Sequence, residues 1–231
     1  MREIVLDTET TGMDPDKGDR IIEIGCIELD NHVPTGKSLQ IYINPERDIP
    51  ADATAVHGIT NEFVADKPIF LEVYTDFVDF IGADSQLVIH NAEFDMKFIN
   101  HHLADVGHKP VPWNRVIDTL GMARKKFPGS PANLDALCRR FGIDNSDRTY
   151  HGALLDSELL AEVYLELLGG RQHHFGLAEQ RKAAQKASGA LIKKDRPVRE
   201  ARPHAPTESE LQEHASLLEK LGDALWKKTE S

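Results

Sequence analysis

Residues 4–12 read Ile4-Val5-Leu6-Asp7-Thr8-Glu9-Thr10-Thr11-Gly12, an apolar run followed by two carboxylates and a glycine. The run predicts a short buried strand that ends at the glycine turn. Because residues two apart in a strand point to the same face, Asp7 and Glu9 project together, with Cβ atoms roughly 6.5–7 Å apart. Two such carboxylates repel each other and lose hydration, which bound divalent cations such as magnesium or manganese would offset. The alternative is that both acids are turn and cap residues at a strand end.

Composition limits the class of protein. The chain has 231 residues, 40% of them hydrophobic and 28% charged, which predicts one globular domain with a segment left over. No apolar run is long enough to span a membrane, and the N-terminus lacks the form of a signal peptide. Two cysteines, Cys26 and Cys138, exclude a disulfide framework, so we expect a cytoplasmic protein without a zinc site. The pairs His101-His102 and His173-His174 are predicted to lie at the surface, because adjacent residues do not share a helix face.

The net charge of −11 is unevenly distributed along the chain. Residues 1–170 carry 15 Lys and Arg against 29 Asp and Glu, residues 171–204 carry 9 against 3, and residues 205–231 carry 3 against 6. An acidic domain binds nucleic acid poorly by itself, because affinity usually comes from neutralised phosphates. A nucleic-acid substrate would therefore require metal ions at the site and a partner that supplies affinity.

Apolar periodicity predicts the other elements. Strands are predicted at residues 20–29, 39–43, 87–89 and 116–117, with a loop at 44–50. Helices are predicted at residues 70–81, 93–106, 134–141 and 153–168, with a further one ending near 127. Short connections favour an antiparallel meander for the first three strands, and the later strands alternate with helices. The pattern predicts an α/β fold with a mixed sheet and helices packed on it.

The character of the chain changes after Gly169-Gly170. Residues 182–206 contain few large apolar residues, many charges and three prolines, which is typical of a flexible linker. Order is expected to resume at Thr207. We therefore predict three segments: a domain at 1–170, a basic linker region at 171–206 and a C-terminal element at 207–231.

Two further carboxylates are predicted to face the core. Asp95 lies in the first turn of its helix, and Phe98 and Ile99 follow at helical spacing, so it points inward. Taken alone, Asp95 is better explained as a helix N-terminal acid that the helix dipole favours. Asp156 begins an apolar stripe that continues at 160, 163 and 167. An unpaired charge on such a stripe is costly, which favours a functional role for Asp156 over a salt bridge or a stripe edge.

His151 precedes Asp156 by five residues, and on one helix the two would lie ~140° apart. They can meet at one site only if His151 lies on the loop before the helix, and Gly152 supports such a break. A histidine beside a metal site is placed to act as a general base. The alternative is an ordinary loop histidine.

Together the motifs resemble those of a known family. The quoted segments are Asp7-Thr8-Glu9-Thr10-Thr11-Gly12, His90-Asn91-Ala92-Glu93-Phe94-Asp95 and His151-Gly152-Ala153-Leu154-Leu155-Asp156. They resemble the three motifs of DnaQ-like DEDDh 3′–5′ exonucleases, over residues 1–170. The resemblance implies a ribonuclease H-like five-stranded mixed sheet with the Asp7/Glu9 strand in its centre. The segment 130–156 resembles proofreading subunits of bacterial replicative DNA polymerases.

The resemblance also implies roles for single residues. Asp7, Glu9, Asp95 and Asp156 would hold two divalent cations, Mg²⁺ or Mn²⁺, and His151 would take the proton from the attacking water. The product would be a nucleoside 5′-monophosphate released from a 3′ end. Residues 56–60 resemble the family's loop near the terminal nucleotide. The implied substrate contacts are Asp7, Glu9, Thr10, Asp52, His57, Asn91 and Asp156. We interpret Asp118, which also matches the family, as a helix cap rather than a ligand.

The tail contains two candidate partner motifs. Residues 172–177 resemble the peptide by which replication proteins bind the sliding clamp, with Gln172, Phe175 and Leu177 at its key positions. The alternative is that Phe175 and Leu177 pack on the domain. Thr207 and Glu210 fit a capping box, and apolar residues recur after it at helical spacing. We expect this helix to dock on a partner, rather than fold back onto the catalytic domain, through Leu211, Leu218, Leu221, Leu225 and Trp226. The resemblance implies that this partner is the catalytic subunit of the polymerase. A small theta-like accessory subunit is a further partner that the resemblance implies.

Two alternative functions compete with proofreading. One is a stand-alone DEDDh exoribonuclease that trims RNA 3′ ends, which would not need a tether. The other is a catalytically inactive scaffold that joins clamp and polymerase, which would not need the complete set of carboxylates and histidine.

Overall fold

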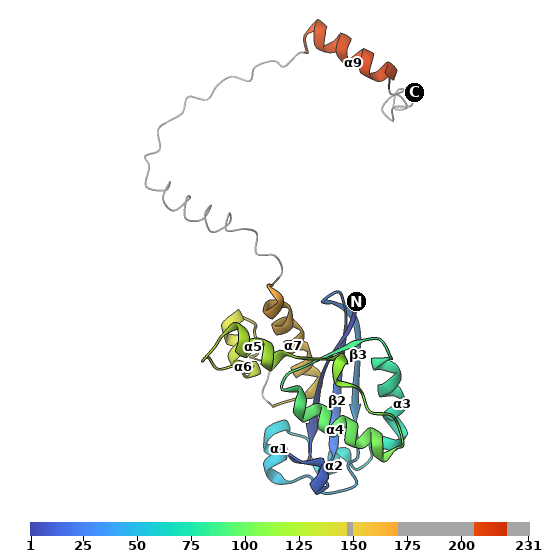
Figure 1. Cartoon of the computed structure of the whole chain (residues 1–231), viewed down its shortest axis with the longest axis vertical. Coiled ribbons are helices and arrows are strands. Elements are labelled where there is room, and N and C mark those ends of the chain that lie inside the picture. The colour runs from blue at the N-terminus through green and yellow to red at the C-terminus, as the bar shows by residue number, and fades with distance from the viewer. Residues whose placement is uncertain (147–149, 171–205, 221–231) are drawn as a thin grey trace. The chain divides into compact units, whose positions relative to one another are not determined.

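The computed structural model describes residues 1–146, 150–170 and 206–220 (Figure 1). The chain divides into two units, Met1–Phe175 and Gly176–Ser231, and each is described by itself. No helix in these described ranges is long and apolar enough to cross a membrane. The three-segment division stays a prediction, since residues 171–205, most of the predicted linker region, lie outside the described ranges.

A five-stranded mixed sheet forms the centre of the first unit. The strands are β1 (Arg2–Thr10), β2 (Ile21–Asp30), β3 (Val33–Tyr42), β4 (Gln86–Ile89) and β5 (Val116–Asp118). Their order is β3-β2-β1-β4-β5, and β1, β2 and β3 pair antiparallel while β4 and β5 run parallel to β1. The predicted meander and the central position of the Asp7/Glu9 strand are therefore confirmed. β3 begins at Val33 rather than at Leu39 because the turn at Asn31-His32, where both φ angles are positive, extends the pairing with β2.

Helices cover both faces of this sheet. They are α1 (Ala51–His57), α2 (Asn61–Val64), α3 (Phe70–Ile81), α4 (Ala92–Asp105), α5 (Thr119–Lys126), α6 (Leu134–Phe141) and α7 (Ala153–Leu168), with short 3₁₀ turns η1 (Pro15–Lys17) and η2 (Trp113–Arg115). The predictions for α6 and α7 are confirmed to the residue, whereas α1 and α2 follow the loop predicted at 44–50 and are not predicted from the sequence. The second unit contains α9 (Glu208–Lys220).

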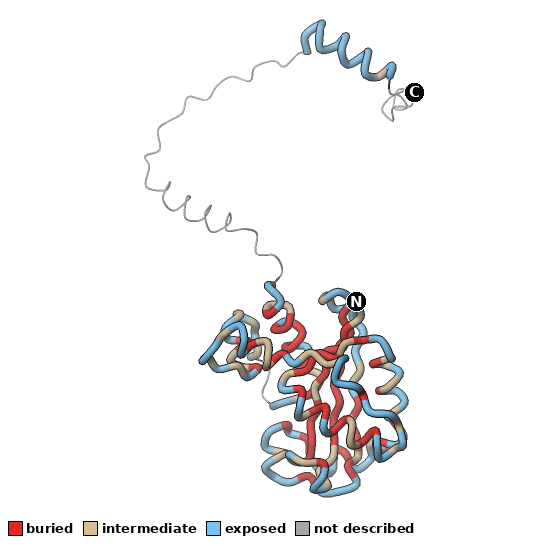
Figure 2. Tube along the Cα trace, in the orientation of Figure 1, coloured by how far each residue is buried: buried red, intermediate tan, exposed pale blue. Residues whose placement is uncertain are grey.

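The alternation of β1 divides the core into two layers. Ile4 and Leu6 pack with α3 and α4 on one face, whereas Val5 packs with α5, α6 and α7 on the other. Burial is concentrated on the strands and the inner sides of these helices (Figure 2). Continuing the alternation, Asp7 and Glu9 face the α7 side of the sheet and Thr8 faces the α4 side. The polar residues at the end of β1 are thus divided between the two faces of the sheet.

α7 lies directly against the backbone of β2 at Gly25. A Cβ atom built on Gly25 would lie 2.2 Å from the carbonyl carbon of Ala153 and 2.3 Å from the nitrogen of Leu154. The hydroxyl of Ser157 donates to the carbonyl of Gly25 at 3.0 Å, and the N–H of Ala153 donates to the Glu23 carboxylate at 3.2 Å. Glycine is therefore required here for close approach, and the first turn of α7 is fixed beside Asp7, which pairs with Gly25 across the sheet.

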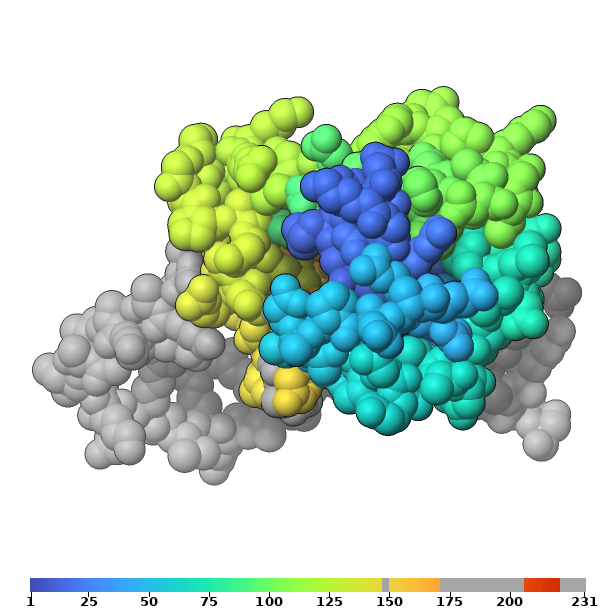
Figure 3. Space-filling view, turned by 90° about the horizontal axis from the view of Figure 1, so that it is seen from below, coloured from blue at the N-terminus to red at the C-terminus, as the bar shows by residue number. Residues whose placement is uncertain are grey.

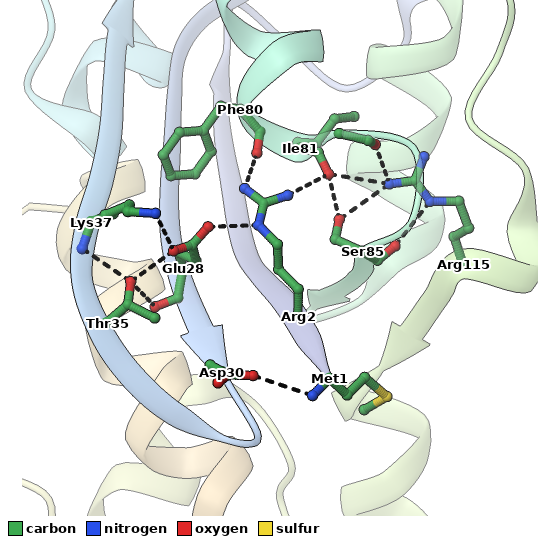
Figure 4. A network of polar contacts seen from close by, with 11 residues as sticks. Met1, Arg2, Glu28, Asp30, Thr35, Lys37, Phe80, Ile81, Ser85 and Arg115 are labelled. Carbon is green, nitrogen blue, oxygen red and sulfur yellow. Dashed lines mark hydrogen bonds and ion pairs between the residues drawn. The ribbon is translucent and has the colours of Figure 1, made fainter.

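Two arginines hold the C-terminus of α3 (Figure 4). Arg2 donates to the carbonyls of Phe80 and Ile81 and pairs with Glu28 at 2.6 Å. Arg115 donates to the carbonyls of Gly82 and Ser85. The Arg2 hydrogen bond is the main cause that lowers the pKa of Glu28 to about 2. The terminal carbonyls of α3 are thus satisfied from β1 and from the residue before β5, which fixes the helix across the sheet.

The predicted surface position of the His101-His102 pair is wrong for His102. Only 3% of His102 is exposed, because neighbours on a helix differ by about 100° and one of the two can face the core. Its Nδ1–H donates to the carbonyl of Phe98, and its Nε2 accepts from the N–H of Ile21. Burial lowers the pKa of His102 to about 4, so the ring is neutral and both of its nitrogens are used. Hydrogen bonds to two backbone groups thus take the place of water for the buried ring.

We predict that Gly25→Ala lowers both stability and activity. The new methyl group must push α7 away from β2, and overpacking of this kind costs about 1–3 kcal/mol of unfolding free energy. Because α7 carries Asp156, a shift of about 1 Å is expected to reduce turnover by roughly 10²-fold. Denaturant unfolding and turnover per folded molecule measure the two effects.

The control is Gly152→Ala, where an added Cβ would meet nothing within 4 Å and φ is −141°. If Gly25→Ala retains the stability and turnover of the Gly152→Ala protein, the close approach does not position α7.

Candidate metal-dependent nuclease site

Asp7 and Glu9 end β1 on the face that α7 covers. Asp7 is half-buried opposite Gly25, and Glu9 is buried opposite Glu23. The ladder of β1 with β2 shifts register between Glu9 and Thr10, so the paired carboxylates lie at the last regular positions of the strand. Glu23 is already engaged by Ala153 and by Gln40. The strand end therefore gathers carboxylates in a part of the core where unbalanced charge is costly.

The start of α7 brings Asp156 and His151 to the same place. Gly152 is the N-cap residue, so His151 precedes the helix, as its spacing predicts. Asp156 is 4% exposed, and its stripe partners Leu160, Val163 and Leu167 are buried, as the pattern predicts. The Nδ1 atom of His151 lies 3.4 Å from Oδ2 of Asp156, and the N–H of His151 donates to the carbonyl of Val56 at 3.1 Å. The imidazole is about half exposed and faces solvent beside a buried carboxylate.

Three of the predicted residues lie close enough together to hold a metal ion. Glu9, His151 and Asp156 each offer one ligand atom, and these atoms lie within 4.8 Å of one another. Carboxylate oxygens from the strand and the helix are the donors that hard divalent cations prefer. The donor set therefore fits such a cation. Figure 3 looks onto this end of the domain, where the surface is hollowed between the end of β1 (blue), the α1 segment (cyan) and the α5–α6 segment (yellow-green).

Asp95 lies on the other side of β1. It is 3% exposed, as its inward spacing predicts, and its Oδ1 accepts from the N–H of Thr8 at 3.0 Å and from the Thr8 hydroxyl at 2.7 Å. Burial raises the pKa of Asp95 to about 7, against the hydrogen bonds from Thr8, which lower it. Asp95 and Asp7 are not members of the three-residue cluster. The structure thus places Asp95 against the same strand but on the α4 face.

Asp118 is a cap, as predicted. One of its oxygens accepts from the N–H groups of Asn91, Ala92 and Leu120, and the other accepts from Gly121. This carboxylate joins the start of α5 to the start of α4. Asn91 itself is exposed and has a positive φ of 65°, and the Asp118 bond stabilises that conformation. Asp118 therefore supports the element that carries Asp95.

The α1 segment places His57 beside His151. Its Nδ1 accepts from the N–H of Ile59 at 3.0 Å, and its buried Nε2 has no hydrogen-bond partner among the described residues. Burial lowers the pKa of His57, and the nearby His151 lowers it further. Asp52 is exposed in the first turn of α1, and the hydroxyl of Thr10 donates to the carbonyl of Gly12. Of the predicted substrate contacts on this loop, His57 is the one with an unused buried donor.

Three supporting residues were missed from the sequence. Glu23 and Gly25 sit within the apolar run of β2, where a buried acid and a strand glycine are signals of a specific contact. Thr8 carried no signal beyond its place between Asp7 and Glu9. The clamp residues Gln172, Phe175 and Leu177, and the helix residues Leu221, Leu225 and Trp226, lie outside the described ranges. Leu211 and Leu218 lie on α9, where Leu211 is exposed.

Comparisons with known proteins identify the family. The exonuclease family model matches residues 4–164. DNA polymerase III subunit epsilon of Rickettsia felis is 51% identical over 222 residues, which cover 94% of this chain and 96% of that protein. The subunit epsilon of Escherichia coli K12 is 43% identical over 240 residues, covering 98% and 97%. The nuclease domain of 3′hExo, a DEDDh family member bound to rAMP, shares the fold, with a TM-score of 0.63 at 23% identity, 72% coverage of this chain and 91% of that one.

The match to the epsilon subunits spans nearly the full length of both chains, and the exonuclease match includes all three motifs. The chain therefore belongs to the family of DNA polymerase III epsilon subunits, the metal-dependent 3′–5′ exonucleases that proofread bacterial DNA replication.

Proposed function

We propose that this chain removes 3′-terminal nucleotides from DNA at a site that holds two divalent cations, Mg²⁺ or Mn²⁺. The observation that carries the proposal is the approach of Glu9, His151 and Asp156 to within 4.8 Å of one another at the end of β1. Two divalent cations would bring four positive charges to a buried group of carboxylates and an anionic phosphodiester. The same need for counter-charge explains why the acidic residues gather here.

Each residue of the site has a proposed role. Asp7, Glu9, Asp95 and Asp156 would bind the ions, with Asp95 approaching from the α4 face of the sheet, where Thr8 donates to it. The chemistry that such ions would supply is stabilisation of the negative charge on the attacking and leaving oxygens. His151 would accept the proton of the attacking water, because its ring is exposed to solvent while its backbone is held by Val56. Release of a nucleoside 5′-monophosphate follows when water adds to the phosphorus and the bond to the 3′-oxygen of the penultimate nucleotide breaks, which leaves a 3′-hydroxyl on the strand.

We assign His57 as a hydrogen-bond donor to the terminal nucleotide. Since its Nδ1 accepts from Ile59, the neutral ring carries its proton on Nε2. That N–H is buried without a partner in the described part of the chain, and the lowered pKa keeps the ring neutral. An unpaired buried donor is costly, and a phosphate or sugar oxygen of the substrate would satisfy it. Thr10, Asp52 and Asn91 remain proposed contacts that rest on the family resemblance.

The tail is proposed to supply the partners. The curated relatives that align over the whole chain are polymerase III subunits. In α9 the capping box is formed: the N–H of Thr207 donates to Glu210 at 2.7 Å, and the N–H of Glu210 donates to the Thr207 hydroxyl at 3.4 Å. Leu211 is 53% exposed on this helix, which suits docking on the catalytic alpha subunit. The clamp motif at 172–177 and a theta-like subunit complete the proposed assembly, which would work in the cytoplasm.

The first prediction concerns metal. Purified protein is expected to shorten 3′-labelled single-stranded DNA in Mg²⁺ or Mn²⁺ and to stop when chelator is added, with RNA as a comparison that tests the exoribonuclease alternative. Asp7→Ala should lose most of this activity and bind Mn²⁺ more weakly in calorimetric titration, while the fold survives because removing one carboxylate relieves repulsion.

Glu93→Ala, which removes an exposed carboxylate two residues from Asp95, is the control. Mn²⁺ affinity and Mg²⁺-dependent turnover in Asp7→Ala that match this control would refute the assignment of Asp7 as a ligand.

The second prediction concerns the general base. His151→Ala should lose roughly 10²–10⁴ in turnover, the usual worth of general-base catalysis, and the acid limb of its pH–rate profile should change. His108→Ala, on the loop that follows α4, is the control for loss of a histidine. An unaltered pH profile in His151→Ala would assign the proton transfer to another group.

The third prediction separates chemistry from assembly. A chain truncated after residue 180 should hydrolyse free single strands at the rate of the full chain but should not co-purify with the alpha subunit, because α9 is missing. A Gln172/Phe175/Leu177 triple-alanine variant should keep alpha binding and lose clamp binding, measured by surface plasmon resonance. Full alpha affinity in the truncated chain would place the docking site in the exonuclease domain instead.

A further inference from the structure

Tyr150 is an exposed aromatic residue immediately before the proposed general base. Its side chain belongs to the large hydrophobic groups at the surface, with 56% exposure, although His151 and the start of α7 follow it directly. Burial of a tyrosine ring is normally favourable, since it removes a large apolar area from water. An exposed ring at the edge of a catalytic site therefore invites a functional explanation.

The ring is nonetheless held in place from one side. A Cβ atom built on Gly58 would lie 3.1 Å from Cγ, 3.2 Å from Cδ2 and 3.4 Å from Cδ1 of Tyr150. Three ring atoms at similar distances mean that the ring lies against the backbone at Gly58, which has a φ of 72° and ends α1. The hydrogen bond from His151 to Val56 joins the same two segments. Tyr150 is thus supported by the loop that carries His57 and remains open to solvent.

We propose that the ring of Tyr150 stacks on a nucleobase adjacent to the scissile phosphate. The inference rests on the proposed function, because it needs a DNA 3′ end at the carboxylates. Aromatic side chains bind single strands in this way irrespective of sequence, since every base presents a π-face. A contact of that kind suits an exonuclease that must accept any terminal base, and it supplies affinity that an acidic domain cannot obtain from phosphates.

Trp113 provides a matched control. It is 55% exposed, almost the same as Tyr150, but it lies in η2 before β5. β5 runs parallel to β4, and β4 runs parallel to β1. Trp113 precedes β5, so it lies at the N-terminal end of these strands, whereas the carboxylates lie at the C-terminal end of β1, about 10 Å or more away. Loss of an exposed aromatic ring there tests whether any such ring affects DNA binding.

The experiment compares Tyr150→Ala, Tyr150→Phe and Trp113→Ala in kcat/KM on 3′-labelled single-stranded DNA with Mg²⁺. Tyr150→Ala is expected to lose roughly 5- to 150-fold, the range found when a stacked aromatic residue is replaced by alanine. Tyr150→Phe keeps the ring and should stay close to wild type, as should Trp113→Ala.

Abasic substrates separate stacking from support of His151. The same strand is prepared with an abasic site at the terminal or at the penultimate position. For one of these two substrates the ratio of wild type to Tyr150→Ala should fall to about one, because the base that the ring contacts is missing. A ratio that stays unchanged on both abasic strands, or no loss in Tyr150→Ala on ordinary DNA, overturns the inference. Absence of Mg²⁺-dependent hydrolysis by the wild type would instead refute the proposed function.

Discussion

The contact between α7 and the bare backbone of Gly25 is the constraint on which the geometry of the site depends. A helix that rests on a strand without an intervening side chain lies closer than ordinary packing allows, and here the Ser157 hydroxyl and the Glu23 carboxylate fix it at two further points. These contacts therefore fix the distance of the first turn of α7 from the sheet and the rotation of the helix about its own axis. Asp156 faces Glu9 as a consequence, and the residue before the helix, His151, is presented at the rim.

This arrangement concentrates negative charge in a poorly hydrated place. The protein balances part of it with hydrogen bonds: Thr8 donates twice to Asp95, and the N–H of Ala153 donates to Glu23. Glu9 and Asp156 instead lie beside His151, and the ligand atoms of the three residues are within 4.8 Å of one another. Burial raises the pKa of Asp95, so a negative charge is also unfavourable on the α4 side of the strand. Cation binding would relieve repulsion in the folded state, so the ions that serve catalysis would also stabilise the domain.

The sequence predicts the parts of this site that follow from periodicity. The polar position of Asp156 on an apolar stripe, the break at Gly152 and the cap at Asp118 each depend on spacing within one element, and each is confirmed. Contacts between distant segments carry no such period: the support of α7 by Gly25 and the bond from Thr8 to Asp95 join residues that are far apart in the chain. α1 was missed because one or two turns of helix after a proline leave little pattern. The burial of His102 on α4 depends on a partner, Ile21, that lies on strand β2.

The distribution of charge gives the tail its place in the proposed mechanism. Residues 1–170 carry 29 acidic against 15 basic side chains, so the domain that holds the chemistry repels the phosphate backbone beyond the site. Bound cations neutralise that repulsion only locally, at the phosphate that is cut. If α9 is docked on the polymerase, a tether of a few tens of residues, with the flexibility that its composition predicts, would raise the concentration of the domain near the primer end to about the millimolar range. A domain of low intrinsic affinity would then engage an end that frays and release one that stays paired, so weak binding of DNA by the exonuclease itself would be a condition for selectivity.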